Sequence, residues 1–387
     1  KYIRFYTNIF IRDIIFNNFL LNFTSDFESF IFMKLIDTGN YNVYFNNDCS
    51  NALNTFVKKF KFSKIFILVD TNTHRDCLAL FLSDFSTTAN IEIIEIENGE
   101  EHKTIDTCVG VWNALSELGA DRQSLMINLG GGVVTDLGGF IASTFQRGIE
   151  FINVPTSLLA MVDASVGGKT GVDLGSLKNQ VGVINTGAMV LIDTTYLKTL
   201  PYNELKSGYV EMLKHGLIQN ESYWSTLKDF SNLKKEKLPQ LIYDSVLIKQ
   251  NIVANDPHEI DLRKTLNFGH TLGHSIESLF LKDNTKRTLL HGEAIAVGII
   301  LATFISHKLL NFPLAKLSSI KSTMIDLFGK IDLKSKDYQE IINLLKFDKK
   351  NSHGNINFVL LHDIGDTKIN CHVDELLILE AFKYYLS

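Results

Sequence analysis

The sequence has little of what marks several specialised protein classes. Only 4 of its 387 residues are cysteine, and none forms a C-x-x-C pair. This argues against a disulfide framework and predicts buried thiols in a reducing compartment, which favours the cytoplasm. A basic excess is also absent, because the formal net charge is −5, and we expect no nucleic-acid partner. An anionic ligand would then need a local cluster of lysine and arginine.

No long apolar run and no low-complexity linker interrupts the chain, so no membrane partner is expected. Phe, Ile and Asn crowd the first 32 residues, but Arg12 and Asp13 keep this stretch short of membrane-spanning length. It also lacks the small-residue cleavage site of a secretory signal. The first methionine is Met33. We therefore expect residues 1–32 to be a non-native or disordered extension outside the functional fold; a genuine N-terminal extension is the alternative.

The apolar pattern changes near Pro201. Over residues 33–199, short runs rich in Ile, Val and Phe alternate with helical stretches, which predicts a Rossmann-like α/β domain with a parallel sheet. Over residues 200–387, apolar residues recur at helical spacing, which predicts a mainly α-helical domain. The expected strands are Ile65–Val69, Ile91–Ile96, Leu125–Leu129, Phe151–Val154 and Met189–Ile192, and the expected helices are Tyr202–Gln219, Leu238–Ile252, Leu266–Leu281 and Ala294–Leu309.

A glycine-rich turn, Gly130–Asp136, follows one of the expected strands. A helix is expected to begin near Asp136, and the glycines would let the backbone approach a pyrophosphate closely. The dinucleotide fingerprint G-x-G-x-x-G is not cleanly met. From this segment alone, a tight turn without a ligand is an equally good interpretation.

The segment Asp163–Asp173 concentrates glycines, hydroxyl groups and charges. Lys169 stands behind two glycines, where its ammonium is suited to an anionic oxygen. Asp163 occupies the position of the first glycine of a P-loop, so we exclude hydrolysis of nucleoside triphosphates. A solvated loop is the alternative, but loops without function seldom combine so many glycines and ionisable groups.

Histidines gather in the second half of the chain. His270 and His274 lie four residues apart and would share one helix face, and His291 follows. The zinc-protease pattern H-E-x-x-H is not met. Two histidines with a carboxylate such as Glu211 are typical of a catalytic metal site. The spacing does not say which two histidines would bind the ion.

These segments, in this order, resemble the 3-dehydroquinate synthase family from Met33 nearly to the C-terminus. The resemblance implies a carbon–oxygen lyase that converts 3-deoxy-D-arabino-heptulosonate 7-phosphate to 3-dehydroquinate and phosphate, in the shikimate pathway to chorismate and the aromatic amino acids. It implies NAD, which oxidises the substrate transiently, and Zn²⁺ or Co²⁺. The matching motifs are Asn98-Gly99-Glu100 with Lys103, Gly131–Asp136, Asp163–Asp173, Lys178-Asn179, Glu211 with Lys214, Arg263 with Asn267–His274, His291-Gly292-Glu293 and Asp348-Lys349-Lys350.

The resemblance also implies a role for each matching residue. The metal ligands would be Glu211, His270 and His291, with His274 on the substrate side. NAD would contact Asp70, Asn72, Glu100, Lys103, Gly132, Val133, Val134, Thr135, Asp136, Thr156, Ser157, Lys178, Tyr196, Leu197, Lys198 and Thr199. The phosphorylated sugar acid would meet Asp163, Lys169, Asn179, Lys214, Lys249, Arg263, Asn267 and Lys349, with Lys169 also near the cofactor. Arg147 would reach into the neighbouring subunit's site, which implies a homodimer.

Three other classes of protein share parts of this pattern. A sugar-phosphate cyclase of secondary metabolism, which makes an inosose or a valiolone, would use the same cofactor and metal, but Lys169-Thr170-Gly171 argues against it. A metal-dependent polyol dehydrogenase would release NADH and would not need so many anion-binding residues. A non-catalytic binding module is a third alternative, which the absence of a bound metal would favour.

Overall fold

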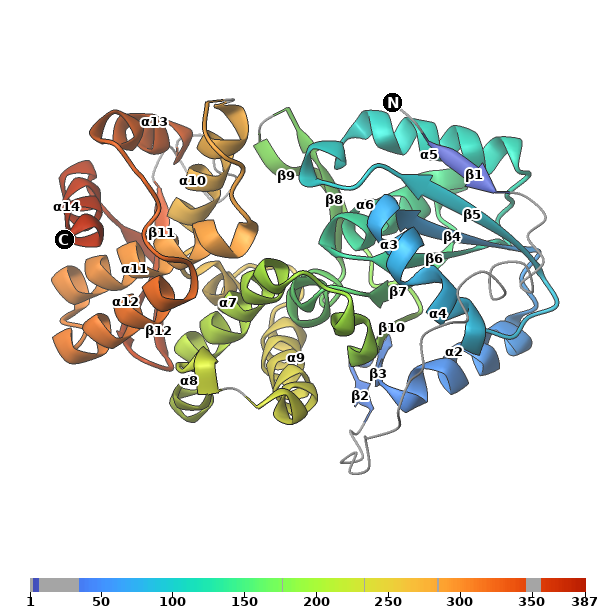
Figure 1. The fold of residues 1–387 in the computed structure, drawn as a ribbon, viewed down its shortest axis with the longest axis horizontal. Helices are drawn as coiled ribbons and strands as arrows, with labels where there is room; N and C mark the ends of the chain where they lie inside the picture. The colour runs from blue at the N-terminus through green and yellow to red at the C-terminus, as the bar shows by residue number, and fades with distance from the viewer. Residues whose placement is uncertain (1–2, 7–34, 176, 233, 284, 346–355) are drawn as a thin grey trace. The chain divides into compact units, whose positions relative to one another are not determined.

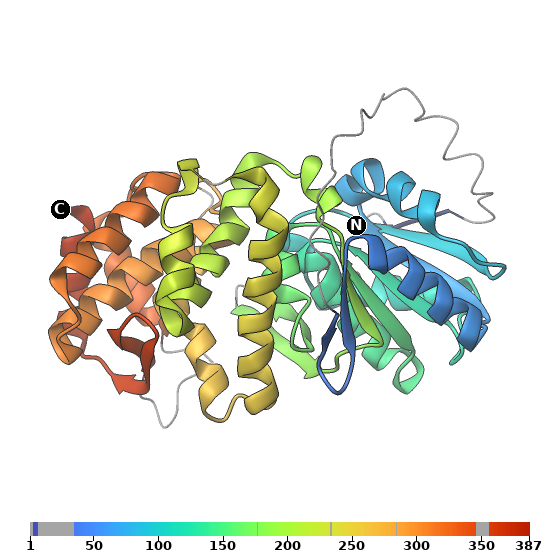
Figure 2. The same cartoon turned by 90° about the horizontal axis from the view of Figure 1, so that it is seen from below.

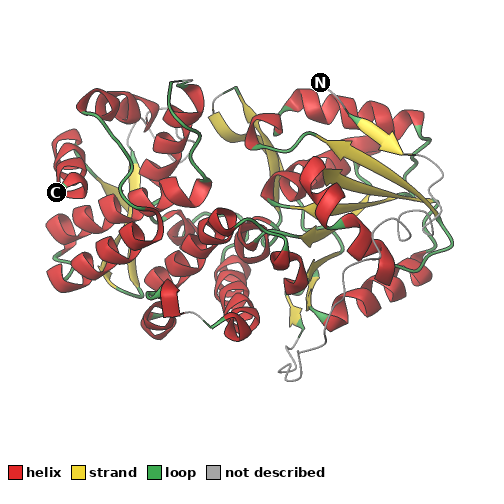
Figure 3. Ribbon diagram, viewed as in Figure 1, coloured by secondary structure: helices red, strands yellow, loops and turns green. Residues whose placement is uncertain are grey.

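The computed structural model describes residues 3–6, 35–175, 177–232, 234–283, 285–345 and 356–387. The chain separates into two compact units, one formed by Lys1–Gly175 with Asn179–Pro201 and the other by Ser176–Lys178 with Tyr202–Ser387. The first unit combines strands with helices, while the second is mainly helical (Figures 1 and 3). The predicted fold class, an α/β domain followed by a mainly helical domain, is confirmed.

The first unit is built on a sheet whose described strands follow the order β1-β5-β4-β6-β7-β10-β3-β2. All neighbours from β5 to β3 are parallel, while β1 and β2 pair antiparallel at the two edges. All five expected strands are present. Their near-continuous apolar sequences fit strands that are buried on both faces. The bounds are β1 Arg4–Tyr6, β2 Ile36–Asp37, β3 Asn42–Phe45, β4 Lys64–Asp70, β5 Asn90–Ile96, β6 Leu125–Gly130, β7 Glu150–Pro155 and β10 Met189–Ile192.

The expectation for residues 1–32 falls mostly on residues outside the described ranges. Within it, Arg4–Tyr6 form β1 and pair with β5. Ile3 packs against the hydrophobic core of the first unit. The interpretation of this segment as a non-native extension stays a prediction.

Helices pack along the parallel strands, as Figure 2 shows for α2 in blue. Helix α6 begins at Gly132 and not near Asp136, because Gly131 already serves as its N-cap. Two interior glycines let α6 lie close to its neighbours: a Cβ on Gly138 would come 2.0 Å from Asn128 Oδ1, and one on Gly139 would come 2.4 Å from Thr170 Cγ2. The helical segments of this unit are α2 Asn47–Phe60, α3 Thr71–Asp76, α4 Leu78–Asp84, η1 Glu100–His102, α5 Ile105–Glu117, α6 Gly132–Thr144, η2 Phe145–Arg147, η3 Ala160–Ala164 and η4 Thr194–Lys198.

Part of the glycine-rich segment Asp163–Asp173 forms a strand, which the sequence did not predict. Strands β8 (Lys169–Leu174) and β9 (Leu177–Ile184) make a separate two-stranded sheet. A Cβ on Gly171 would lie 2.5 Å from the Val181 oxygen, and one on Gly182 would lie 2.2 Å from the Thr170 oxygen. Glycine is therefore required here by the close approach of two strands.

The second unit is mainly helical, as expected, and Figure 2 shows its helices, coloured from yellow-green to red, packed side by side. The expected helix Leu266–Leu281 begins only at His270, because Gly269 takes a left-handed conformation (φ 78°) and separates it from the preceding 3₁₀ turn. The hairpin β11–β12 was not predicted. The bounds are α7 Tyr202–Gln219, α8 Glu221–Leu227, η5 Phe230–Asn232, η6 Lys235–Lys237, α9 Leu238–Asn255, η7 Leu262–Asn267, α10 His270–Lys282, α11 His291–Leu310, α12 Leu314–Phe328, α13 Ser335–Leu345, β11 Asn357–Asp363, β12 Asp366–His372 and α14 Glu375–Leu386.

Helix α11 is long and apolar enough to cross a membrane, by length and composition alone. However, 78% of its most apolar window is buried inside the protein, where it packs against α7, α10, α12 and α14. It is a core helix. Small residues bring its first half close to other elements: a Cβ on Gly298 would lie 2.0 Å from the Gly269 oxygen, and one on Gly292 would lie 2.3 Å from the Ser207 oxygen.

Candidate metal centre and cofactor site

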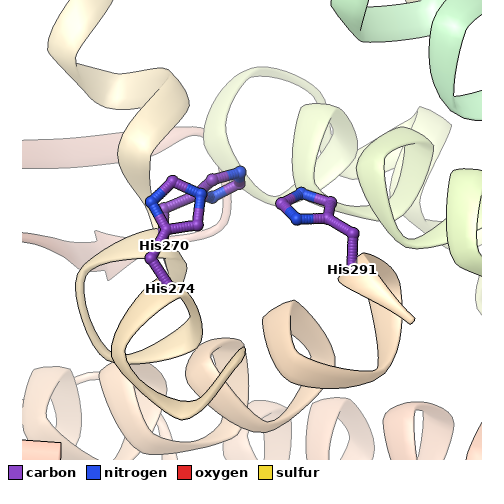
Figure 4. Close-up of side chains that lie close together, drawn as sticks. All are labelled: His270, His274 and His291. Carbon is purple, nitrogen blue, oxygen red and sulfur yellow. The ribbon is translucent and has the colours of Figure 1, made fainter. Parts of the chain in front are cut away.

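Three histidines converge at the start of α10 and α11. His270 is the first residue of α10, His274 lies one turn later, and His291 is the first residue of α11 (Figure 4). Their ring centroids are 5.1 to 5.7 Å apart. One nitrogen of each ring lies within 4.8 Å of the others, so the three side chains could share an ion.

Glu211 on α7 reaches the same place from a third helix. Its Oε1 atom lies 3.4 Å from His270 Nε2 and 3.5 Å from His291 Nε2. Ligand atoms at about 2.1 Å from a tetrahedral Zn²⁺ ion are separated by about 3.4 Å, so these distances fit a shared ion. The carboxylate is fully buried, and its other oxygen, Oε2, pairs with the Lys214 ammonium. Oε1 is thus the oxygen that faces the two imidazole nitrogens.

The second nitrogen of each of these two rings faces an oxygen. His270 Nδ1 lies 3.1 Å from the Phe268 carbonyl oxygen, and His291 Nδ1 lies 3.2 Å from Glu277 Oε2. This leaves both Nε2 atoms directed at Glu211. Metal-binding histidines usually have such a partner on the nitrogen away from the ion. Glu277 was not among the predicted site residues; its position three residues after His274 was the available signal.

The charges around Glu211 affect one another strongly. Burial alone would raise the pKa of Glu211, but the Lys214 ammonium and His270 hold it well below its usual range. Burial lowers the pKa of His270. Burial would also lower that of His291, but Glu277 and Glu211 raise it to about 9. Lys214 pairs with Glu211 and is buried with it.

The other predicted anion-binding residues of the second unit lie on elements that pack against α7. Lys249 on α9 and Arg263 in η7 are both buried. Arg263 Nη1 donates to the Pro257 carbonyl at 2.7 Å, and Asn267 Nδ2 donates to Glu259 Oε1 at 2.7 Å. These contacts hold the cationic and amide groups in place.

In the first unit, the predicted cofactor residues lie where parallel strands end. The chain runs from β4 to β5 on one side and later returns to β6 on the other side of β4. Ligands bind α/β sheets at such a switch point, outside the carboxyl ends of the strands. Asp70 ends β4 and caps α3 by accepting from the Thr73 N–H at 2.8 Å, and Asn72 follows on that helix.

The glycine-rich turn lies at the end of the adjacent strand, β6. Gly132, Val133, Val134 and Thr135 form the first turn of α6, whose N–H groups are suited to a phosphate. A Cβ on Gly131 would come 3.3 Å from Ser157 Oγ, and the Thr156 N–H donates to the Gly130 oxygen. The turn Tyr196, Leu197, Lys198 and Thr199 follows the end of β10.

Three residues predicted for cofactor or substrate gather around the buried Lys103. Its ammonium donates to Asp136 Oδ2 at 2.6 Å and to Asn179 Oδ1 at 2.7 Å, and Glu100 lies 3.9 Å away. The pKa of Asp136 is raised, chiefly by burial. The charges of Glu100 and Asp163 raise it further, while the Lys103 ammonium lowers it. The network therefore joins the loop after β5, helix α6 and strand β9.

The remaining predicted residues are scattered. Lys169 is exposed at the start of β8, and Lys178 is bonded to Glu277 in the second unit at 2.8 Å. Arg147 is exposed and, like Gln146 before it, has a left-handed backbone (φ 71° and 49°). Lys349 lies outside the described residues.

Residues 93–207 match the family 3-dehydroquinate synthase N-terminal, and residues 208–351 match 3-dehydroquinate synthase C-terminal. A 3-dehydroquinate synthase of Parabacteroides distasonis is 44% identical over 341 residues, covering 87% of this chain and 96% of the relative. One of Dictyoglomus thermophilum is 36% identical over 350 residues, covering 89% and 95%.

Solved structures show the same fold. A 2-deoxy-scyllo-inosose synthase complexed with carbaglucose-6-phosphate, NAD⁺ and Co²⁺ has a TM-score of 0.77 at 26% identity, covering 89% of this chain and 96% of that one. A 2-epi-5-epi-valiolone synthase from Streptomyces hygroscopicus with NAD⁺ and Zn²⁺ has a TM-score of 0.78 at 23% identity, covering 94% and 99%. The two family matches together span more than half of the chain. This chain belongs to the 3-dehydroquinate synthase family.

Proposed function

We propose that the chain converts 3-deoxy-D-arabino-heptulosonate 7-phosphate to 3-dehydroquinate and phosphate, using NAD and one divalent metal ion held by Glu211, His270 and His291. The observation that carries the metal assignment is the buried Glu211 carboxylate, which lies 3.4 and 3.5 Å from two imidazole nitrogens. The activity is that of the curated relatives, which match this chain over most of its length. The cofactor and the individual residue roles are our inference.

Glu211 is a better third ligand than His274. The lowered pKa of Glu211 keeps it ionised, and its Oε1 atom faces the Nε2 atoms of both His270 and His291. Two histidines and one carboxylate leave open positions for substrate oxygens. His274, one turn further along α10, then lies beside the ion, where it can hold or move a proton of a bound hydroxyl.

A bound Zn²⁺ or Co²⁺ ion would supply Lewis acidity to a substrate hydroxyl. The protein's own groups bind and orient the anion. Lys214 and Lys249 present compact ammonium groups, while the planar guanidinium of Arg263 suits a carboxylate or phosphate in two-point contact. Asn267 is held by Glu259 at 2.7 Å, so its amide is fixed for one orientation.

NAD would supply a reversible hydride acceptor. We place its pyrophosphate at Gly132–Thr135, where the first turn of α6 offers N–H groups and the glycines leave room. Asp70 and Asn72, after the neighbouring strand, would then bind the ribose. Lys103 would hold Asp136 in place for the cofactor and Asn179 in place for the substrate.

Asp163, Lys169 and Lys349 are assigned to substrate by resemblance to the family alone. The cytoplasmic location and the homodimer, with Arg147 at the neighbour's site, rest on the same resemblance.

The rival activity, an inosose or valiolone synthase, has weaker support. The inosose synthase structure is 26% identical to this chain, against 44% for the 3-dehydroquinate synthase of P. distasonis.

The test is phosphate release from the heptulosonate phosphate with NAD at a concentration far below that of substrate. We expect many turnovers without net NADH, loss of activity after a chelator, and recovery with Zn²⁺ or Co²⁺. Stoichiometric NADH without phosphate would indicate a polyol dehydrogenase. Faster turnover of glucose 6-phosphate or sedoheptulose 7-phosphate would indicate a different cyclase.

A further inference from the structure

Glu277 is a buried carboxylate to which the proposed function gives no role. It lies on α10 and is 7% exposed. Its two oxygens contact two different donors: Oε1 accepts from Lys178 Nζ at 2.8 Å, and Oε2 lies 3.2 Å from His291 Nδ1. An ionised carboxylate can do both, because each of its oxygens is an acceptor. Glu277 thus joins one proposed metal ligand to a lysine of strand β9.

The contact with Glu277 determines which nitrogen of His291 is available to an ion. When an ion takes the place of the hydrogen on Nε2, the hydrogen on Nδ1 stays with the Glu277 oxygen, so Nδ1 remains the donor and the lone pair of Nε2 is left to the ion. Nε2 is the atom that lies 3.5 Å from Glu211 Oε1. For His270 the equivalent partner is the backbone carbonyl of Phe268, which no substitution removes. The orientation of His291 depends on a side chain.

We propose that Glu277 is a positioning residue of the metal centre, holding His291 in the tautomer whose Nε2 faces the ion, while Lys178 holds Glu277. The inference rests on the proposed metal site and adds two residues to it. It also changes the role of Lys178, which the family resemblance assigns to NAD: in the second unit its ammonium acts through Glu277.

Glutamine cannot replace glutamate in this arrangement. Lys178 and His291 Nδ1 are both donors, but an amide offers one acceptor oxygen and one donor NH₂ group. In the glutamine variant, the amide oxygen can stay with Lys178, and the amide NH₂ group then faces Nδ1. This favours the tautomer of His291 with its hydrogen on Nε2, and a protonated Nε2 has no lone pair for an ion. Removing the ammonium of Lys178 would release the amide oxygen to His291.

The experiment measures Co²⁺ affinity by competition with a chelating dye, together with the visible absorption of bound Co²⁺. The variants are Glu277→Gln, Lys178→Met and the double variant. We expect Glu277→Gln to weaken Co²⁺ binding about 10- to 100-fold, Lys178→Met to weaken it less, and the double variant to bind more tightly than Glu277→Gln. This rescue is not expected of a residue with a merely structural role.

Glu340→Gln is the matched control. Glu340 pairs with Lys282 at the other end of α10, at 3.7 Å, and its side chain is 47% exposed. Lys282 is 12 residues from His270, or about 18 Å along the helix. The control removes a carboxylate paired with a lysine of the same helix, and we expect wild-type Co²⁺ affinity and an unchanged spectrum.

Two results with the folded variants would overturn the inference. One is wild-type affinity and spectrum in Glu277→Gln; the other is a double variant that binds no better than Glu277→Gln although both are folded by circular dichroism. If the wild-type protein binds no Co²⁺, the proposed metal site is wrong, and so is this inference, which depends on it. If Glu277→Gln does not fold, ¹⁵N chemical shifts of His291 in the Zn²⁺-loaded wild type decide: metal on Nε2 supports the inference, and metal on Nδ1 refutes it.

Discussion

Replacing Gly298 with alanine tests whether close packing of α10 and α11 creates the histidine cluster. A Cβ at position 298 would lie 2.0 Å from the Gly269 oxygen, whereas ordinary contact begins at 3.4 Å. The two helices must therefore separate there by about 1.4 Å, and such overpacking destabilises by about 1–3 kcal/mol. Alanine also favours the helix by about 1 kcal/mol. We expect a net loss of about 0–2 kcal/mol in the free energy of unfolding.

The effect on metal binding should be larger than the effect on stability. Gly269 immediately precedes His270, while Gly298 lies on the same helix as His291. Metal–ligand distances are held within about 0.2 Å, so a shift of more than 1 Å between the two helices misplaces a ligand. We expect Gly298→Ala to lower Zn²⁺ affinity by about 100-fold.

The assay combines urea unfolding of the metal-free protein with Zn²⁺ affinity from chelator competition. Ile305→Val is the matched control, because Ile305 is fully buried on α11 and lies 14 residues, or about 21 Å, from His291. It should lose about 0.5–1.5 kcal/mol of stability with unchanged Zn²⁺ affinity. If Gly298→Ala binds Zn²⁺ as tightly as Ile305→Val does, the packing argument is wrong.

Three further expectations concern single side chains. His270→Ala should abolish metal binding and activity together; activity with stoichiometric metal would remove His270 from the ligand set. Arg263→Lys should raise the KM for the heptulosonate phosphate about 10-fold or more, because a two-point fork becomes a point charge, and unchanged kinetics would remove Arg263 from the anion site. Asp256→Asn should lower the free energy of unfolding at pH 7 by about 1.5–3 kcal/mol, because the Asp256 carboxylate accepts backbone N–H groups of Ile260, Asp261 and Arg263. Burial would raise the pKa of Asp256, but these hydrogen bonds lower it overall, so its contribution is present above the unfolded-state pKa of about 3.9 and is lost as the pH falls through the folded-state value. Unfolding curves of both proteins between about pH 6 and 2 should converge at the acid end, and a constant difference would contradict the assignment.

The parallel strands were predictable because a strand that is buried on both faces has an almost continuous run of apolar residues. Ile65–Val69 and Leu125–Leu129 are apolar at nearly every position, and both lie inside the sheet. The hairpin β8–β9 has no such apolar run. Its exposed residues and the glycines at 171 and 182, which the close strands require, resemble a loop in composition.

The donor set of the candidate metal centre was only partly predictable. Helical spacing placed His270 and His274 on one face, and the sequence also offered His291 and Glu211 as candidates, but spacing could not say which of these residues meet. Their convergence depends on contacts between elements distant in sequence, such as Gly298 against Gly269. The family resemblance selected Glu211, His270 and His291 from these candidates, because it carries information about tertiary structure that spacing lacks.

We infer that the buried charges of the second unit serve binding more than stability. Glu211 and Lys214 are almost completely inaccessible, and replacing such a pair with apolar residues often leaves a protein as stable or more so. A purely structural core would therefore not need them. Here the Glu211 carboxylate also faces two imidazole nitrogens, while Glu277 and Phe268 orient those rings from behind. On the proposed assignment, such an arrangement would hold the ligand atoms in place before a cation binds, so less ordering would accompany binding.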